Sequence, residues 1–237
     1  MDALRDELLG KLDNKIAFTI PVFGGIPVPE SVVVTWGIML FLVLLSIICT
    51  RRLKKVPGKA QLVAEMFVGF INKFTKNTLG EHWKPFAAYF GTIGLYIGCA
   101  NLIGMFGITP PTKDLNVTAA LAIMSAALIY GASFRYHGFK GGLHKFVEPM
   151  PLLAPINVME VVIRPLSLCM RLFGNVLGSF IIMELIKLAM PAIVPMALSM
   201  YFDVFDGIIQ TIVFVFLTAL FTQEQEQNED INNIPNN

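Results

Sequence analysis

Ionisable side chains interrupt the apolar sequence in the C-terminal part of the 237-residue chain. Seven of them lie in the apolar segments 157–190 and 196–222, namely Glu160, Arg164, Arg171, Glu184, Lys187, Asp203 and Asp206. A charge at the centre of a bilayer costs from about 3 to more than about 10 kcal/mol, so a residue that carries one there usually serves a function. The earlier apolar segments 32–50, 86–105 and 117–134 contain no charged residue. We therefore expect the function to reside in the C-terminal part.

Arg171 is the first candidate, because arginine keeps its proton in proteins and can act there only as a fixed positive charge. Asn175 follows it by four residues and shares its helix face, while Asp203, Asp206 and Gln210 share one face of the next apolar segment. Packing the two segments together predicts a polar seam inside the membrane.

The counter-ion of Arg171 has two possible sources. If Arg171 pairs permanently with Asp203 or Asp206, the pair is a buried salt bridge that mainly fixes the register of the helices. If the counter-ion belongs to another subunit and leaves again, Arg171 is a switch. The residues alone leave both interpretations open.

The composition is that of an integral membrane protein. Hydrophobic residues make up 55% of the chain and charged residues only 15%, with a mean hydropathy of +0.66, whereas soluble domains are nearer a quarter charged. The net charge of +1 says nothing about an acidic partner, and no Lys/Arg block resembles a nucleic-acid-binding arm, so we expect no nucleic acid among the partners. Cys49, Cys99 and Cys169 are far apart and show no metal-ligand spacing, so we expect neither a metal site nor a cofactor.

We expect one all-α membrane domain over residues 1–237, with five transmembrane helices and a surface amphipathic helix. The last two spans should form a long, steeply tilted hairpin, because segment 157–190 would measure about 51 Å as a helix, well beyond the bilayer core. The expected parts are an external N-terminal segment (1–31), a first span (32–50), a cytoplasmic amphipathic segment (51–85), the second and third spans (86–134), the hairpin (146–222) and a frayed cytoplasmic tail (223–237).

Finer features follow from particular residue types. A short surface helix is expected near the N-terminus, and the Pro- and Gly-rich connector 21–30 should be irregular. Gly94 and Gly98 are four residues apart, a spacing that lets another helix approach closely. Asp114 should act as a turn and helix cap.

Basic residues indicate the orientation. Eight Lys and Arg residues lie between positions 51 and 84 and three lie from 135 to 145, against three in the N-terminal segment and one, Lys113, in the turn. Because basic loops stay on the cytoplasmic side, the N-terminus should lie outside and the C-terminus inside. Arg164 should then lie near the inner surface, where it either reaches the lipid headgroups or lines an inner exit.

Three stretches together resemble subunit a of the F-type ATP synthase. RPLSLCMRLFGNVLG contains the arginine and asparagine of the signature helix of that family, NLIGMFGITPPTKDLNVTAALA is similar to its turn before the next span, and GIIQTIVFVFLTALF to its last helix. Arg171, Asn175 and Gln210 fall on the matching positions. The three matches occur in the family's order and, with the five-span pattern, cover nearly the whole chain.

The resemblance implies a stator subunit in a bacterial plasma membrane. In that family a ring of c subunits, each with one ionisable carboxylate, turns against subunit a, which offers one aqueous half-channel from each side. Arg171 would lie between the half-channels and favour the charged form of each passing carboxylate. The implied partners are the c-subunit ring, the b-subunit peripheral stalk, other ATP synthase subunits and the bilayer. The coupling ion would be the proton, with Na⁺ as the alternative.

Three carboxylates are candidates for the outer half-channel. Many members of the family carry a carboxylate nine residues after the arginine, where this chain has Phe180, so Glu184 one turn later could replace it. Asp203 stands where some relatives have histidine, and Asp206 follows. We hypothesise that all three line the outer half-channel. The alternative for Glu184 is a surface ion pair with Lys187.

Two other classes of function were weighed against this one. A self-contained ion-coupled transporter would work without partner subunits, and an intramembrane aspartyl protease would use Asp203 and Asp206. The sequence contains no G-x-x-x-x-G-K-[ST] nucleotide-binding loop, so we expect no catalytic site in this chain.

Overall fold

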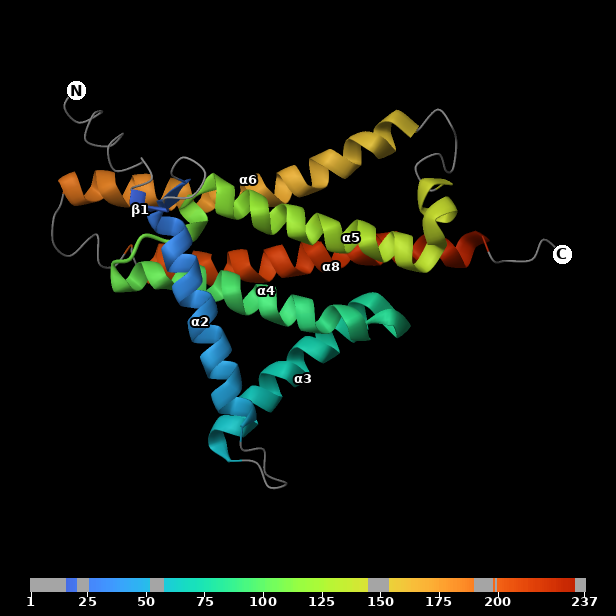
Figure 1. Cartoon of the computed structure of the whole chain (residues 1–237), viewed down its shortest axis with the longest axis horizontal. Coiled ribbons are helices and arrows are strands. Elements are labelled where there is room, and N and C mark those ends of the chain that lie inside the picture. The colour runs from blue at the N-terminus through green and yellow to red at the C-terminus, as the bar shows by residue number, and fades with distance from the viewer. Residues whose placement is uncertain are drawn as a thin grey trace.

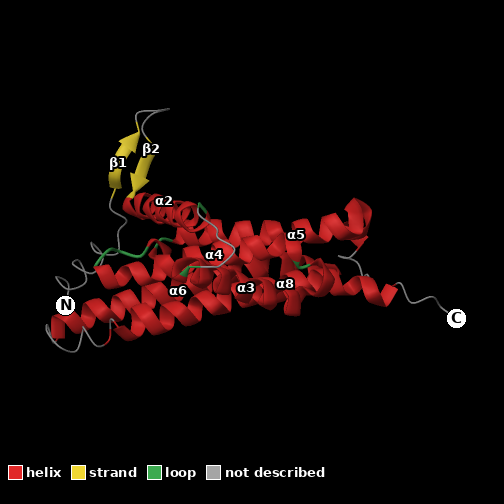
Figure 2. Cartoon of the chain, turned by 90° about the horizontal axis from the view of Figure 1, so that it is seen from below, coloured by secondary structure: helices red, strands yellow, loops and turns green. Residues whose placement is uncertain are grey.

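The computed structural model describes residues 16–20, 26–51, 58–144, 154–189, 198 and 200–232. These residues form six α-helices and one short β-hairpin, shown in Figures 1 and 2. The helices are α2 (Glu30–Thr50), α3 (Lys59–Leu79), α4 (Lys84–Leu102), α5 (Leu115–His144), α6 (Ala154–Ala189) and α8 (Gly207–Asn232). A π-helical segment, Met200–Asp206, leads into α8, and single 3₁₀ turns occur at Gly80–His82, Ile103–Phe106 and Pro111–Lys113.

Five helical stretches in the described residues are long and apolar enough to cross a membrane. They agree in number and order with the five predicted spans, and the remaining helix, α3, occupies the predicted amphipathic segment. The fold class expected from the sequence is therefore confirmed. Helix α6 contains Pro165 and is nevertheless continuous. Its total length is 36 residues, or about 54 Å.

The N-terminal connector is more ordered than predicted. Strand β1 (Ile16–Ile20) pairs with β2 (Ile26–Pro29) in an antiparallel hairpin that stands beside the start of α2 (Figure 2). The expectation of an irregular segment at 21–30 was wrong for the part that forms β2. In a two-stranded hairpin each strand has a free edge, so prolines that lack an N–H donor are tolerated. The predicted N-terminal surface helix lies outside the described residues.

Helix α4 packs against α8 through the two glycines singled out in the sequence. A Cβ atom on Gly94 would lie 3.3 Å from Val215 Cγ2, and one on Gly98 would lie 3.8 Å from Thr211 Cγ2. The close approach predicted from the glycine spacing is confirmed. The fully buried Phe90, Ile97 and Phe214 form part of the core around this contact.

Helix α5 is the main support of α6 and α8. It packs against both, although the N-terminal part of α6 rises away from it, whereas α6 and α8 contact each other at only a few positions (Figure 1). Leu168 and Leu172 of α6 are fully buried within the core cluster. The predicted hairpin therefore consists of two helices joined by isolated polar contacts and braced by a third helix.

The tail is helical further than expected. We predicted fraying from residue 223, but α8 continues to Asn232, and 233–237 lie outside the described residues. Glu and Gln are good helix formers, and Glu224 is held by a contact to α6 described below. The predicted break at 191–195 also lies outside the described residues.

Candidate ion-translocation site

The two amides predicted to share the seam are in direct contact. Asn175 Nδ2 on α6 donates a hydrogen bond of 2.7 Å to Gln210 Oε1 on α8. Gln210 is only 3% exposed, and its Nε2 group is buried without a hydrogen-bond partner among the described residues. The pair therefore ties α6 to α8 and leaves one buried donor available at the seam.

Arg171 lies on α6 one helical turn before Asn175 and is half-buried. None of the ion pairs between described residues involves Arg171, and it makes no side-chain hydrogen bond with any of them. Asp203 and Asp206 therefore do not neutralise its charge. Of the two interpretations given above, the permanent internal salt bridge is the one that this geometry contradicts.

Asp203 and Asp206 lie in the π-helical segment that precedes α8. Asp203 packs tightly on the 3₁₀ turn Ile103–Phe106 that follows α4, where a Cβ atom on Gly104 would come within 2.9 Å of its Oδ1 atom. Both aspartates are half-buried. An aspartyl protease dyad would need aspartates on two facing helices, whereas Asp203 and Asp206 come from one segment.

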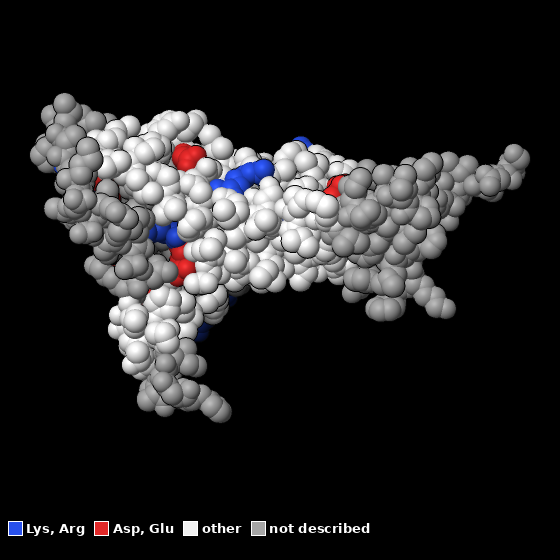
Figure 3. All heavy atoms as spheres, turned by 90° about the horizontal axis from the view of Figure 1, so that it is seen from above, with Lys and Arg blue, Asp and Glu red and all other residues white. Residues whose placement is uncertain are grey.

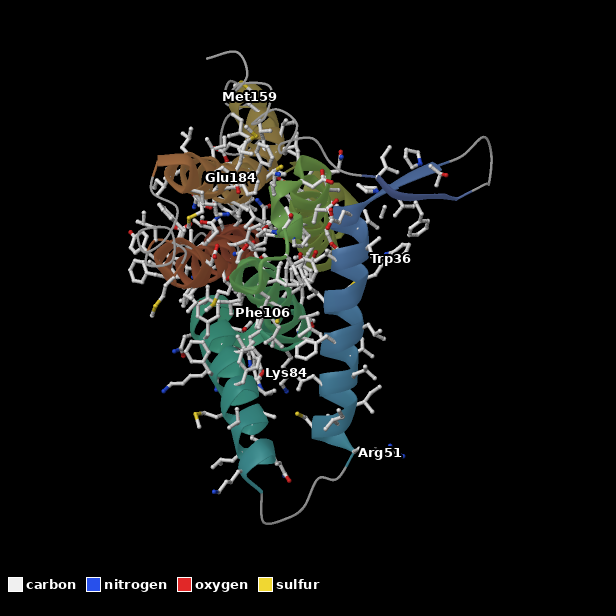
Figure 4. The ribbon with its side chains drawn as sticks, turned by 90° about the vertical axis from the view of Figure 1, so that its left-hand side faces the viewer. Trp36, Arg51, Lys84, Phe106, Met159 and Glu184 are labelled. Carbon is white, nitrogen blue, oxygen red and sulfur yellow. The ribbon has the colours of Figure 1, made fainter. Side chains whose placement is uncertain are left out.

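Glu184 is buried near the end of α6. Lys187 Nζ donates a hydrogen bond of 3.1 Å to the Glu184 Oε1 atom, which forms the predicted i, i+3 ion pair. Glu184 is only 8% exposed, whereas Lys187 is exposed. Figure 4 shows Glu184 facing the neighbouring helices, while Trp36 points away from the bundle. The alternative interpretation of Glu184 as a surface ion pair is therefore right that its partner is Lys187 and wrong that Glu184 lies on the surface.

A second cation reaches this part of α6 from the turn before α5. Lys113 Nζ lies 3.7 Å from the centroid of the Phe180 ring, and the lysine is 8% exposed. The stem of the lysine is thus buried and its ammonium group faces an aromatic ring, a favourable cation–π arrangement. The sequence identified Lys113 only as a loop charge, because nothing local to the turn indicates that α6 passes over it.

The turn itself is built on polar contacts. Asp114 caps α5 as predicted, accepting a 2.9 Å bond from the Asn116 backbone N–H, and its other oxygen accepts a 2.6 Å bond from Ser31 at the start of α2. Thr112 donates to Asn101 Oδ1 at 3.1 Å, and Asn101 Nδ2 donates to the Gly207 carbonyl at 3.3 Å. This network joins the turn to α2, α4 and α8.

Arg164 forms a separate ionic cluster toward the other end of α6. Its Nη2 atom pairs with Glu160 and, at 2.8 Å, with Glu224 of α8, and its guanidinium carbon lies 5.2 Å from the Phe221 ring centroid. Its side chain is 12% exposed, while both carboxylates are half-exposed or more. Glu224 was missed in the sequence because it lies in the segment expected to fray.

Seen from the side of α6, the described surface is mostly uncharged and carries only a few basic and acidic groups (Figure 3). Val162, Leu166 and Met170 are exposed apolar residues of this helix. Taken together, these features define a multi-span helical membrane protein in which a pair of amides joins the last two long helices and a half-buried arginine lies one turn away on α6.

The chain belongs to the ATP synthase subunit a family. The family model described as "ATP synthase A chain" matches residues 32–223. The chain is 35% identical to the sodium-ion-specific ATP synthase subunit a of Propionigenium modestum over 215 residues, which cover 84% of this chain and 74% of the relative. It is also 35% identical to subunit a of Moorella thermoacetica (84% and 91% covered) and 38% identical to that of Citrifermentans bemidjiense (82% and 86% covered).

Membership in this family makes the chain a membrane component of the ATP synthase, with a part in ATP synthesis and ion transport alongside the other subunits of the complex. It favours the first of the three functional classes weighed from the sequence over a self-contained transporter or a protease.

Proposed function

We propose that this chain is the stator subunit against which the c-subunit ring turns, and that Arg171 is the charge that separates two aqueous half-channels. The observation that carries the proposal is the half-buried guanidinium with no carboxylate partner among the described residues of its own chain. A cation in an apolar environment needs an anion nearby. A carboxylate on each passing c subunit supplies that anion transiently.

The electrostatics of this arrangement couple ion flow to rotation. A positive charge within about 4–6 Å of a carboxyl group favours its ionised form, so the c-subunit carboxylate releases its ion as it reaches Arg171. The same charge repels a free cation that would otherwise pass directly between the half-channels. Ions therefore cross only by travelling with the ring, and this chain needs no catalytic site for ATP.

Glu184, Asp203 and Asp206 form the outer half-channel in this proposal. They belong to the parts of α6 and of the π-helical segment that lie close to the turn before α5, and carboxylates can both exchange protons and bind Na⁺. Asn175 and Gln210 hold α6 and α8 together beside Arg171, and the unpaired Gln210 Nε2 donor faces the same seam.

The proton is the proposed coupling ion, and Na⁺ is the second candidate because the Propionigenium modestum relative is named sodium ion specific. The proposed setting is a bacterial plasma membrane, with the N-terminus outside and the C-terminus in the cytoplasm. The proposed direct partners are the c-subunit ring and the b-subunit peripheral stalk.

The test compares wild type, Arg171→Ala and Arg164→Ala in vesicles that carry equal amounts of the assembled complex. ATP-driven ion uptake should vanish in Arg171→Ala, while ATP hydrolysis by the detached peripheral sector should remain. Arg164→Ala is the matched control, because it removes the same side chain from the same helix at a position already neutralised by Glu160 and Glu224. It should slow uptake without abolishing it.

Uptake near the wild-type rate in Arg171→Ala would refute the proposed role of Arg171. Comparing uptake with and without Na⁺, and with and without a protonophore, identifies the coupling ion in the same experiment.

A further inference from the structure

Asn101 connects the outer turn to the helix that carries Gln210. It is only 5% exposed, near the C-terminal end of α4, and both polar atoms of its amide are engaged: Oδ1 accepts from Thr112, and Nδ2 donates to the Gly207 carbonyl of α8. The second bond joins residues 106 positions apart in the sequence.

Gly207 is the residue at which the π-helical segment becomes α-helical. In a π-helix each carbonyl pairs with the N–H five residues on, and in an α-helix with the N–H four residues on. The two carbonyls that compete for one N–H at such a junction belong to the π-helical segment, while the Gly207 carbonyl lies in the first turn of α8 and is held in addition from outside the helix ladder. The Gly207 carbonyl has two side-chain donors, Asn101 Nδ2 at 3.3 Å and Thr211 Oγ1 at 2.8 Å.

The fit between Asn101 and the junction is also steric. A Cβ atom on Gly207 would lie 3.0 Å from the Asn101 Cβ atom, so a larger residue at position 207 would push α8 away from α4. Hydrogen bonding and close packing thus act at the same point.

The junction lies between the acidic and the amide parts of the proposed site. Asp203 and Asp206 precede it, and Gln210 follows it by one helical turn and meets Asn175, which is one turn from Arg171. Converting the π-helical segment to α-helix shifts the register by one residue, which turns the side chains on one side of the junction by about 100° relative to those on the other.

We propose that Asn101 is a positioning residue for ion translocation: it holds the π-to-α junction at Gly207 and so fixes the directions in which Asp203 and Asp206 point relative to Gln210. This inference rests on the proposed function. Asn101 touches no transported ion and acts through the register of α8.

The test uses ATP synthesis in proteoliposomes that contain the complete complex with its peripheral sector outside, driven by a fixed electrical potential. Lumenal Na⁺ and lumenal pH are titrated separately, because the lumen faces the outer half-channel. In Asn101→Leu, the cation concentration for half-maximal rate should rise roughly fivefold per assembled complex, the population shift expected for the loss of about one net hydrogen bond.

Thr112→Val is the matched control. It removes the other hydrogen bond of the same amide but leaves the bond to Gly207, so its half-maximal concentration should stay within about twofold of wild type. A variant that merely weakened the fold would reduce the amount of complex without changing the cation dependence of the complexes that form.

Gly207→Ala provides a second route to the same junction, because it keeps every polar group and adds only the crowded Cβ atom. It should raise the half-maximal concentration as Asn101→Leu does, and it carries the test if Asn101→Leu fails to assemble. Wild-type cation dependence in Asn101→Leu, or in Gly207→Ala where Asn101→Leu yields no complex, would overturn the inference. A wild-type complex without cation-driven synthesis would instead refute the proposed function.

Discussion

Arg171 precedes Asn175 by one helical turn on α6, and the amide pair of Asn175 and Gln210 has a physical consequence for the proposed site. Asn175 and Gln210 are neutral at every pH, so they hold α6 against α8 without neutralising the guanidinium. A carboxylate at position 175, one turn from Arg171, would be within reach of an internal salt bridge of the kind not found for Arg171 among the described residues, and in the proposed mechanism it would compete with an incoming carboxylate. The amides thus join the helices and leave the positive charge available.

The contact between the two amides predicts a strongly non-additive pair of substitutions. Asn175→Leu and Gln210→Leu should each lower ATP-driven ion uptake per assembled complex, because each breaks the bond between α6 and α8. Asn175→Leu also leaves the buried Gln210 amide without its partner, at a cost of about 1–3 kcal/mol. The double variant should be little worse than the more severe single one, since both act on one interaction. Ile209→Val, at an exposed neighbouring position, serves as the control. Additive losses would show that the two amides act independently.

Helical spacing predicted the residues of the seam, and of these the structure brings Asn175 and Gln210 into direct contact. Arg171 and Asn175 are four residues apart, and Asp203, Asp206 and Gln210 follow one another at helical intervals. Helical spacing did not identify Asn101, Thr112 or Glu224 as contacts, since their partners lie in other elements and no local pattern encodes which elements meet. Phe180 illustrates the same limit. It stands where many members of the family carry a carboxylate, and this difference gave no sign that the Lys113 ammonium group would lie over the Phe180 ring.

At the scale of elements, α4 and α8 meet through glycines that differ in how much space they leave. Gly94 faces Val215 at a distance tighter than ordinary van der Waals contact, whereas Gly98 faces Thr211 at an ordinary distance. The two positions are one turn apart on the same helix, so they form a natural pair for comparison.

Gly94→Val should therefore destabilise the assembled complex, by about 1–3 kcal/mol as is typical for overpacking, while Gly98→Ala should be nearly neutral. The melting temperature of the purified complex measures both. Adding Val215→Ala to Gly94→Val should recover part of the loss, because it removes the methyl groups in the way. Equal melting temperatures for Gly94→Val and Gly98→Ala would mean that α4 and α8 pack less closely than the structure shows.

The helices were predictable and the short connections between them were not. Long apolar runs determine five spans in any context, because a membrane requires about 20 apolar residues for each crossing. The hairpin at Ile16–Pro29 and the π-helical segment depend on pairing and packing with other elements, which periodicity does not report. The same holds for the tail, whose helix is extended by good helix formers and by the Arg164 contact to Glu224.

For the whole molecule, the basic residue Arg51 and the β-hairpin lie at opposite ends of α2. The hairpin immediately precedes Glu30, and Arg51 follows Thr50 at the other end of the helix. If the basic end is cytoplasmic, the hairpin lies outside.

This orientation is tested with single cysteines in a variant whose three native cysteines are replaced by alanine. Thr19→Cys on β1 and Asn77→Cys on α3 are both at exposed positions. A membrane-impermeant thiol reagent should label Thr19→Cys in right-side-out vesicles and Asn77→Cys in inverted vesicles. The reverse pattern would place the N-terminus in the cytoplasm.

The long-range bond of Asn101 also sets a time scale for assembly. Ribosomes add about 5–20 residues per second, so the Gly207 carbonyl is made roughly 5–20 s after the amide that it accepts from. Thr112, only 11 residues away, is made within about 2 s. During biosynthesis, a half-satisfied amide in α4 therefore waits in the membrane for the last helix, and the newly inserted chain stays incomplete until that helix arrives.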